Sequence, residues 1–356
     1  MIIIEDHQLT FEAIKKGDWS LFPPYFQESL LFCKDWLNGK EEFNLQTSGS
    51  TGKPKTISIK RIQMENSAKA TGDFFKITAD SKLLCCLNTA MIAGKMMLVR
   101  AMEWKSKVHL IEPNGLPLKS FPQNQKFDFV AMVPAQIENS LGDIESTPLL
   151  KNIRSLIIGG APLSNELQKE IAKLPCNSFQ TYGMTETVSH IALAKISGTA
   201  PLVYRVLPGV EINTNENNQL VIKAPMALHP LTTSDIVKII SPQEFIWKGR
   251  SDFTINSGGI KIQPEEIEKS ISSKVIKFFN NSRYFISSEP HSKWGEQVVL
   301  IIESQEPSDW NAANFKKELR VVLEKYACPK KIHFIENFIE TTSGKINRHK
   351  TAQLTQ

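Results

Sequence analysis

The sequence predicts an α/β protein built in two parts. A large N-terminal α/β domain of layered sheets and helices is expected over residues 1–249, and a small, mobile C-terminal α+β domain over residues 250–356. Short apolar strands alternate with helical stretches through the first part, as in a sheet with helices on its faces. The polar string Gly249-Arg250-Ser251-Asp252 then marks a change in texture. A chain of 356 residues also favours two domains over one.

The expected elements follow from apolar runs bounded by turn residues. Residues 1–45 carry scattered aromatic side chains and are expected to pack against the main sheet. Ser164 is a suitable N-cap for the helix after it, and Pro264 begins a helix whose first turn is acidic. The expected strands are Thr56–Ile59, Leu83–Leu87, Val108–Ile111, Phe127–Val133, Ile153–Ile158 and Ser178–Thr181, and the expected helices are Arg61–Lys76, Asn165–Leu174, the helix from Pro264, and Trp310–Lys325.

Composition excludes several classes of protein. With 41% hydrophobic and 22% charged residues, the chain has the balance of a soluble protein with a large core. The net charge of +5 is modest, and no basic run carries interleaved aromatics, so nucleic acid is not an expected partner. The N-terminus lacks the basic region of a signal peptide, and the longest apolar region, 83–99, is interrupted by Asn88 and Lys95. No membrane span is therefore expected.

The cysteine pattern indicates a cytoplasmic protein. The five cysteines are odd in number and lack C-x-x-C spacing, which argues against a disulfide framework and a zinc site. Buried structural thiols in a reducing compartment are expected.

A loop rich in glycine, hydroxyl and lysine side chains is the first candidate for chemistry. Glycines let backbone N–H groups approach an anion, and hydroxyls and ammonium groups add donors, so the expected guest is a polyphosphate. Only two residues separate Gly49 from Gly52, which excludes the Walker A loop of P-loop kinases and GTPases. Taken alone, a cluster of this composition is usually a surface turn. Its residues are Thr47, Ser48, Gly49, Ser50, Thr51, Gly52, Lys53, Pro54 and Lys55.

Two further strings follow predicted strands. Gly159-Gly160-Ala161-Pro162 offers small residues on which a flat ligand can lie at a strand's carboxyl end. In Tyr182-Gly183-Met184-Thr185-Glu186-Thr187, Tyr182 could stack on a base and Thr185 could donate to a phosphate. Glu186 could bind Mg²⁺, which prefers oxygen ligands. Each string alone could also be an ordinary turn.

The later strings supply an acid, cations and a second glycine turn. Asp235 could accept both hydroxyls of a ribose, and Arg250 could pair with ribose or phosphate oxygens. Ser257-Gly258-Gly259-Ile260-Lys261 is a glycine turn beside a cation. In Thr341-Thr342-Ser343-Gly344-Lys345, the lysine could swing onto an anion, although a frayed basic tail is the plainer alternative.

In this order, the strings resemble the adenylate-forming superfamily of acyl-CoA synthetases, adenylation domains and luciferases. The resemblance runs from about residue 45 to the end. It makes 47–55 the phosphate loop, 182–187 the Y-G-x-T-E motif and Asp235 the ribose acid. It also makes Asp252 the hinge, and Gly258, Gly259 and Lys261 part of the coenzyme A channel. Lys345 then corresponds to the catalytic lysine.

The resemblance implies two half-reactions. MgATP and a carboxylic acid give an acyl-adenylate, and coenzyme A then takes the acyl group. Tyr182-Gly183-Met184-Thr185-Glu186-Thr187 with the following Val188-Ser189-His190-Ile191 is most similar to the o-succinylbenzoate–CoA ligases of menaquinone synthesis. Lys95, Ser189 and His190 are candidates for the acyl pocket, and a homodimer is left open.

The sequence departs from the superfamily in two places. Only 46 residues precede the loop, where well over a hundred are usual, and Lys261 stands where arginine is common. Another acid, or a carrier-protein acceptor, is one alternative function. A non-catalytic nucleotide-binding protein is another, but such a protein needs neither Glu186 nor Lys345.

Overall fold

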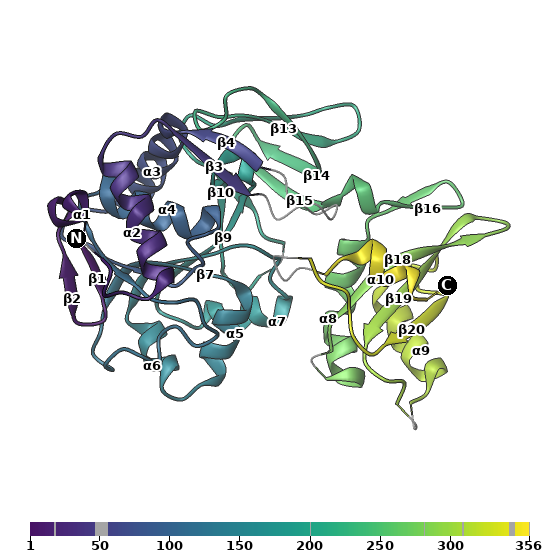
Figure 1. Ribbon diagram of the computed structural model, residues 1–356. Helices are drawn as coiled ribbons and strands as arrows, with labels where there is room; N and C mark the ends of the chain where they lie inside the picture. The colour runs from purple at the N-terminus through teal and green to yellow at the C-terminus, as the bar shows by residue number, and fades with distance from the viewer. Residues whose placement is uncertain are drawn as a thin grey trace.

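The computed structural model describes residues 1–17, 19–46, 56–199, 201–280, 282–307, 310–341 and 346–355. Within these residues the strands form a thirteen-stranded sheet, a five-stranded sheet and a two-stranded sheet. The strands of the largest sheet end at Arg250, and those of the five-stranded sheet begin at Ile255. Figure 1 shows the two larger sheets in separate lobes joined through the region between β15 and α8.

The parallel half of the large sheet has the order β9-β8-β7-β5-β6-β1, and every neighbouring pair in it is parallel. Most of its strands are rich in apolar side chains because helices cover both faces, although β9 carries several polar residues. One face packs against helices α2, α3 and α4, and the other against α5, α6 and α7. The strands are β1 (Ile2–Ile4), β5 (Lys82–Cys85), β6 (Lys107–Leu110), β7 (Phe127–Met132), β8 (Ile153–Ile158) and β9 (Asn177–Gly183). The helices are α2 (Pro24–Leu37), α3 (Arg61–Phe75), α4 (Ile92–Glu103), α5 (Pro134–Gly142), α6 (Ser146–Lys151) and α7 (Asn165–Ala172).

The antiparallel half continues the same sheet from β9 through β10, β11, β15, β14 and β13 to β12. Its long central hairpin pairs Asp235 with Arg250. The strands are β10 (His190–Lys195), β11 (Tyr204–Val206), β12 (Glu211–Thr214), β13 (Gln219–Lys223), β14 (Leu231–Ser241) and β15 (Glu244–Arg250). A short 3-10 helix, η1 (Thr185–Thr187), lies between β9 and β10.

The N-terminal residues pack against the sheet, as predicted. β1 pairs with β6, and Trp36 is buried and stacks on Phe43 with ring centroids 5.5 Å apart. The remaining elements here are β2 (His7–Leu9), α1 (Phe11–Lys16) and the antiparallel pair β3 (Glu42–Gln46) and β4 (Thr56–Lys60).

The second lobe has its own core. Apolar side chains of α8 and α9 pack on one face of the five-stranded sheet, and α10 covers the other face together with Phe338. The elements are η2 (Ser251–Phe253), β16 (Ile255–Ser257), β17 (Ile260–Ile262), α8 (Pro264–Phe279), β18 (Tyr284–His291), β19 (Gly295–Glu303), α9 (Ala312–Val322), β20 (Lys331–Ile335) and α10 (Arg348–Gln353). Ser272 of α8 donates to Glu166 of α7 at 2.5 Å, and this bond joins the two lobes.

The predicted fold class is confirmed, and most predicted elements are found within two or three residues. β8 has the predicted bounds, and Ser164 accepts the amide of Leu167 as the N-cap of α7. The helix predicted from Trp310 starts at Ala312, because the Asn311 side chain caps it. Four cysteines are buried and Cys176 is half-buried. The division at residue 250 and the mobility of the second lobe stay predictions.

Among the helices of the described residues, none combines the length and the apolar character that crossing a membrane would need.

Candidate active site

Residues 159–162 and residues 182–187 meet at one edge of the sheet because they follow neighbouring parallel strands. β8 and β9 are paired in parallel, so their carboxyl ends lie side by side. Gly160 follows β8 with a φ of +91°, a value that suits glycine. Ala161 and Pro162 are exposed after it, and the Gln180 side chain donates to the Ala161 carbonyl at 3.2 Å. The turn predicted to carry a flat ligand therefore lies beside the end of β9, where Tyr182 stands.

Asp235 is the centre of a buried hydrogen-bond network. The Tyr182 hydroxyl donates to Asp235 Oδ2 at 2.6 Å, and Trp247 Nε1 donates to Oδ1 at 2.9 Å. The Asp235 amide donates to Thr233 Oγ1 at 3.0 Å. Only 7% of Asp235 is exposed. Two donors thus hold the carboxylate in one orientation, with lone pairs left over for a further donor.

Tyr182 contributes its hydroxyl to this network while its ring packs in an aromatic cluster. The ring meets Phe245 edge-on at 5.1 Å and Tyr204 at 5.8 Å. Burial, together with the neighbouring Asp235 charge, raises the pKa of Tyr182 far above its usual range. The hydroxyl therefore stays protonated and donates. Stacking of Tyr182 on a base stays a prediction.

Trp247 is a site residue that the sequence analysis missed. Its indole contacts Asp235 on one side, and on the other Lys269 Nζ of α8 lies 4.9 Å from its ring. In the sequence, Trp247 is only an aromatic residue three positions before Arg250, and the structure shows that its strand pairs with that of Asp235.

Arg250 and Asp252 are joined by an ion pair. Arg250 Nη2 donates to Asp252 Oδ2 at 2.6 Å, and Arg250 is the register partner of Asp235. The predicted ribose residues and the predicted hinge are therefore adjacent at the end of β15. About a third of the Arg250 side chain is exposed, at 34%.

Glu186 lies on η1 with its carboxylate unengaged. It is exposed and forms no hydrogen bond or ion pair with any described residue, and Thr185 precedes it. In the described part of the chain, no three His, Cys, Asp or Glu side chains are grouped as a metal site. A single carboxylate is compatible with Mg²⁺ binding, because in nucleotide enzymes the substrate phosphates and water complete the coordination of the ion.

The turn after η1 is tight and strained. Val188 has φ 65° and ψ −49°, a region that β-branched residues avoid, and the Ser189 amide donates to the Thr187 carbonyl at 2.6 Å across it. Gly183 packs directly against this turn, because a Cβ at Gly183 would collide with the backbone of Ser189 and His190. Such strain persists only where surrounding structure enforces it, and it often marks a functional site.

Arg100 is buried beside this turn and was also missed. Only 2% of it is exposed, and it has no carboxylate partner among the described residues. Its Nη2 donates to Ser189 Oγ at 2.9 Å, its Nη1 lies 3.7 Å from Met97 Sδ, and its Nε has no described partner. Burial lowers the pKa of Arg100 to about 9, so it is charged at neutral pH. A buried, unpaired guanidinium is costly unless an anion binds it.

Ser189 and His190 form a directed chain of hydrogen bonds with Arg100. Burial, and then the Arg100 charge, lowers the pKa of His190 well below its usual range, so the imidazole is neutral. Thr71 Oγ1 donates to the Ser67 carbonyl at 2.9 Å and must accept from His190 Nε2 at 3.2 Å. His190 Nδ1 is then an acceptor for Ser189 Oγ at 3.4 Å. Ser189 therefore offers an oxygen lone pair to Arg100.

Lys95 lies elsewhere. Its Nζ donates to the carbonyls of Thr89 and Ala90 at 2.8 and 3.1 Å and lies 5.5 Å from the Phe32 ring. It is half-buried, and no hydrogen bond joins it to Ser189 or His190 in the residues that the structure describes. The structure therefore groups two of the three predicted acyl-pocket residues, Ser189 and His190, with Arg100 instead of Lys95.

Gly258 and Gly259 form the two-residue turn of the β16–β17 hairpin. Their φ values of 62° and 83° fit a primed hairpin turn. A Cβ at Gly259 would meet nothing within 4 Å, and Lys261 is exposed. Figure 1 shows this hairpin on the lobe away from β9. In this arrangement the predicted channel residues Gly258, Gly259 and Lys261 lie on a different lobe from residues 182–187.

The predicted phosphate loop, 47–55, and Lys345 lie outside the described residues. The residues on either side of the loop, and the residue after Lys345, are described. β3 and β4 flank the loop as an antiparallel pair, and Ile346 forms a bridge with Glu340.

A family model described as AMP-binding enzyme matches residues 44–221. The curated 2-succinylbenzoate–CoA ligase of Listeria monocytogenes serotype 4b is 26% identical over 352 residues, which cover 91% of this chain and 72% of the relative.

Two solved structures are also similar to this chain over most of its length. An acyl-CoA synthetase (AMP-forming)/AMP-acid ligase II-like protein from Dyadobacter fermentans is 35% identical, with a TM-score of 0.64 over 98% of this chain and 99% of that one. The o-succinylbenzoate CoA synthetase of Bacillus subtilis, solved with its acyl-adenylate intermediate, is 21% identical, with a TM-score of 0.72 over 88% of this chain and 68% of that one.

The family match spans half of the 356 residues, and the Dyadobacter chain matches almost end to end. The predicted resemblance is thereby confirmed, and the chain belongs to the AMP-binding enzyme family.

Proposed function

We propose that this protein is an AMP-forming acid–CoA ligase whose substrate is a dicarboxylic aryl acid, o-succinylbenzoate. The buried, unpaired Arg100 is the observation that supports an acid with a second carboxylate. A substrate anion would supply the partner that Arg100 lacks among the described residues. The names of the curated relatives support the same acid. The product would be o-succinylbenzoyl-CoA, a step of menaquinone synthesis.

In the first half-reaction a carboxylate oxygen of the acid attacks the α-phosphorus of MgATP. A P–O bond forms to give the acyl-adenylate, and pyrophosphate leaves. The chain's part is to bring like charges together and stabilise them, so preorganised donors matter most. The loop 47–55 and Thr185 would hold phosphates, and Lys345 would bridge the carboxylate and the phosphate oxygens.

The nucleotide would lie at the carboxyl ends of β8 and β9. The 160–162 turn and Tyr182 would flank adenine, and Asp235 with Arg250 would hold the ribose. Asp235 suits this role because Tyr182 and Trp247 orient it, so a ribose hydroxyl would meet an ionised acceptor held in place. Mg²⁺ would bind Glu186 and neutralise phosphate charge.

In the second half-reaction the sulfur of coenzyme A attacks the acyl carbon. The C–S bond forms, the thiol proton passes to solvent, and AMP leaves with the acyl–oxygen bond's electron pair. The Gly258–Gly259 turn would line the thiol path after the C-terminal lobe has turned about Asp252.

The far carboxylate of the acid would be held by Arg100. Its Nε is free of any described partner, and Ser189 holds its Nη2 in place. The neutral His190 keeps that hydroxyl oriented without adding a charge that would compete for the anion.

We also infer a cytoplasmic location, because five unpaired cysteines suit a reducing compartment. A homodimer stays a prediction that sedimentation would test. Another aryl acid is the second candidate substrate, since the residues around Arg100 specify an anion and not one carbon skeleton.

The test is AMP release from MgATP in the presence of coenzyme A, with o-succinylbenzoate compared against benzoates and fatty acids. Strong preference for o-succinylbenzoate supports the proposal. Turnover with a monocarboxylic acid instead would overturn the assigned substrate. ATP binding without turnover on any acid would favour the non-catalytic alternative.

A further inference from the structure

The C-terminal lobe places a lysine against a residue of the candidate active site. Lys269 lies on α8, and its Nζ is 4.9 Å from the centre of the Trp247 ring on β15. The edge of the same indole, Nε1, donates to Asp235 Oδ1 at 2.9 Å. Figure 1 shows α8 on the side of its lobe that faces the large sheet. A side chain of one lobe is therefore linked to Asp235 of the other through a single residue.

Lys269 has no carboxylate partner among the described residues, although acids lie close to it in α8. Glu266 pairs with Lys248 at 2.5 Å, and Glu268 binds Arg348 through both oxygens, at 2.7 and 2.8 Å. Lys269 is half-buried. A half-buried ammonium needs another electron-rich group in place of the water it has lost, and the face of an indole is such a group.

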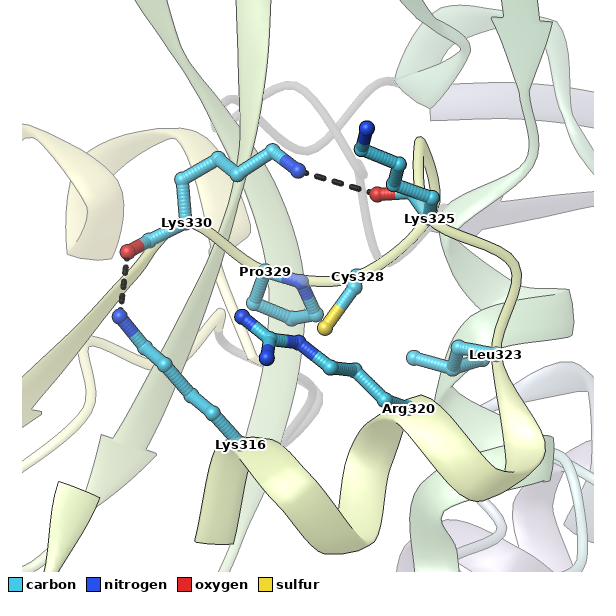
Figure 2. A pocket seen from close by; sticks show the side chains of 7 residues that line it. All are labelled: Lys316, Arg320, Leu323, Lys325, Cys328, Pro329 and Lys330. Atoms are coloured by element: carbon cyan, nitrogen blue, oxygen red, sulfur yellow. Dashed lines mark hydrogen bonds between the residues drawn. The ribbon is translucent and has the colours of Figure 1, made fainter. Parts of the chain in front are cut away.

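Other unpaired lysines of this lobe are satisfied in a different way. Figure 2 shows Lys316 Nζ donating to the Lys330 carbonyl, at 2.7 Å, and Lys330 Nζ donating to the Lys325 carbonyl, at 3.0 Å. Lys269 Nζ forms no hydrogen bond with any residue that the structure describes, so its recorded contact is the one with the Trp247 ring. The stacking on Trp247 is therefore a specific feature of this lysine.

A cation over the face of an indole acts on the N–H group at its edge. The positive charge attracts the π electrons of the ring, which makes the N–H hydrogen more positive and the N–H a stronger donor. Stacking also restricts the ring to one orientation, and so aims Nε1 at Asp235. Lys269 thus strengthens and directs one of the two side-chain bonds that hold the Asp235 carboxylate.

The contact depends on the present arrangement of the lobes. The Lys269 carbonyl accepts a hydrogen bond from the Asn165 side chain of α7 at 3.1 Å, and Ser272, one turn later, donates to Glu166 at 2.5 Å. Lys269 therefore lies where α8 is held against the N-terminal lobe. If this lobe turns, the cation leaves the Trp247 ring.

We propose that Lys269 is a positioning residue that the C-terminal lobe supplies to the nucleotide site, where it acts on Asp235 through Trp247. The inference rests on the proposed function, which assigns the ribose to Asp235. In the present arrangement the ribose is held firmly for adenylation. Once the lobe has turned, Trp247 lacks its cation and AMP is released more easily. By linkage, a nucleotide bound at Asp235 favours the present arrangement by the same factor.

The experiment measures the Kd for AMP by titration calorimetry in the wild type and in Lys269→Met, which keeps the length of the side chain but removes its charge. We expect the Kd to rise about fivefold or more, the lower end of coupling between sites. Lys269→Arg should restore binding to within about twofold, because a guanidinium also stacks on an indole. Thioester formation from supplied acyl-adenylate should be unchanged in Lys269→Met, since the lobe has then turned away.

The same substitution in a Trp247→Phe background tests the route through the indole. Phenylalanine keeps a ring face for the cation but has no N–H for Asp235. Lys269→Met should then change the Kd for AMP by less than about twofold, because the two residues act as one unit. An equal loss of affinity in both backgrounds would show that Lys269 acts by another route and would overturn the inference.

Lys248→Met is the matched control, because Lys248 joins the same two elements through Glu266 but has no recorded contact with the Trp247 ring. A largely exposed ion pair contributes little, so AMP binding should be unchanged. An equal loss in Lys248→Met would trace the effect to docking of the lobes in general and would contradict the role of Lys269.

AMP binding is measured without acid or coenzyme A, so it distinguishes the two proposals. A wild type that binds AMP but activates no acid would overturn the proposed function and leave the comparison of the variants in force. Equal AMP affinity in the wild type and in folded Lys269→Met would overturn this inference, even in an active ligase.

Discussion

Asp235 shows what a motif residue gains from its surroundings. The sequence marks it as a carboxylate before an apolar strand, but its orientation comes from Tyr182 and Trp247, which approach it from different strands. Such partners cannot be read from local sequence, because strand register determines them.

Replacing Trp247 with phenylalanine should weaken nucleotide binding. The ring and its contact with Lys269 would stay, but Asp235 Oδ1 would lose its donor. A hydrogen bond to a charged group contributes about 1.5–3 kcal/mol, so the KM for ATP should rise about tenfold or more. Steady-state kinetics at saturating acid would measure this.

Trp36→Phe is the matched control for Trp247→Phe. Trp36 Nε1 also donates to a carboxylate, Glu103 at 3.0 Å, but far from the nucleotide residues. Its loss should lower stability and leave the KM for ATP unchanged. Equal KM values for both variants would show that Trp247 does not position Asp235 for nucleotide binding.

Arg100 could have been found from the sequence. It stands in the run Met96-Met97-Leu98-Val99-Arg100-Ala101-Met102, in which all the remaining side chains are apolar. A single arginine at a position that must be buried predicts a buried charge. The role of Lys95 was predicted instead, because Lys95 also interrupts an apolar stretch, but its carbonyl partners lie in its own neighbourhood.

At the scale of elements, α8 carries a buried acid at the junction of the two lobes. Glu265 is 6% exposed, its Oε2 has no described partner, and it packs against Gly249 of β15. Burial raises the pKa of Glu265 to about 7, although the Arg348 charge opposes this. The folded state therefore binds a proton between about pH 4.5 and 7 that the unfolded state releases.

The stability of the protein should fall as pH rises through this range, because the unfolded state binds fewer protons there. Glu265→Gln removes the titration and should be more stable than the wild type at pH 8, by up to about 3 kcal/mol. At pH 4.5 the two should be nearly equal. Urea unfolding at both values would measure the difference. Glu266→Gln is the control, since Glu266 is exposed and paired with Lys248 at 2.5 Å. Equal pH dependence in the wild type and Glu265→Gln would contradict this.

The elements themselves were largely predictable. Most strands of the parallel half are rich in apolar side chains, and Ser164 and Pro264 mark helix starts directly. The antiparallel half was less predictable, because most of its strands mix buried and exposed residues and are paired across turns by their register. The sequence shows where Asp235 and Arg250 lie, but not that they are register partners.

At the scale of the whole molecule, the two lobes belong to different sheets and meet through α7, α8 and β15. The Ser272–Glu166 bond and the Asn165 side chain's bond to the Lys269 carbonyl, 3.1 Å, hold the present arrangement. If the C-terminal lobe turns between half-reactions, these bonds must break. No sequence pattern could predict them, because their residues lie about a hundred positions apart.

Lys345→Ala should separate the half-reactions. Acyl-adenylate formation, followed as pyrophosphate release, should fall by at least a hundredfold, because a cation that bridges like charges is lost. Thioester formation from supplied acyl-adenylate and coenzyme A should stay within a fewfold of the wild type, since the Gly258–Gly259 side of the lobe serves that step. Lys350→Ala is the control, because the Lys350 side chain is exposed on α10. Equal loss in both half-reactions would rule out the rotation.

We propose that the buried Arg100 selects a dicarboxylic acid, and the variant Arg100→Met tests this claim. Methionine removes the charge but keeps an apolar side chain in the core, so the fold should be kept or stabilised. The measurement is the ratio of kcat/KM for o-succinylbenzoate to kcat/KM for benzoate in the wild type and in the variant. The ratio should fall at least a hundredfold in Arg100→Met and be partly restored in Arg100→Lys. An unchanged ratio in a folded variant would contradict the claim.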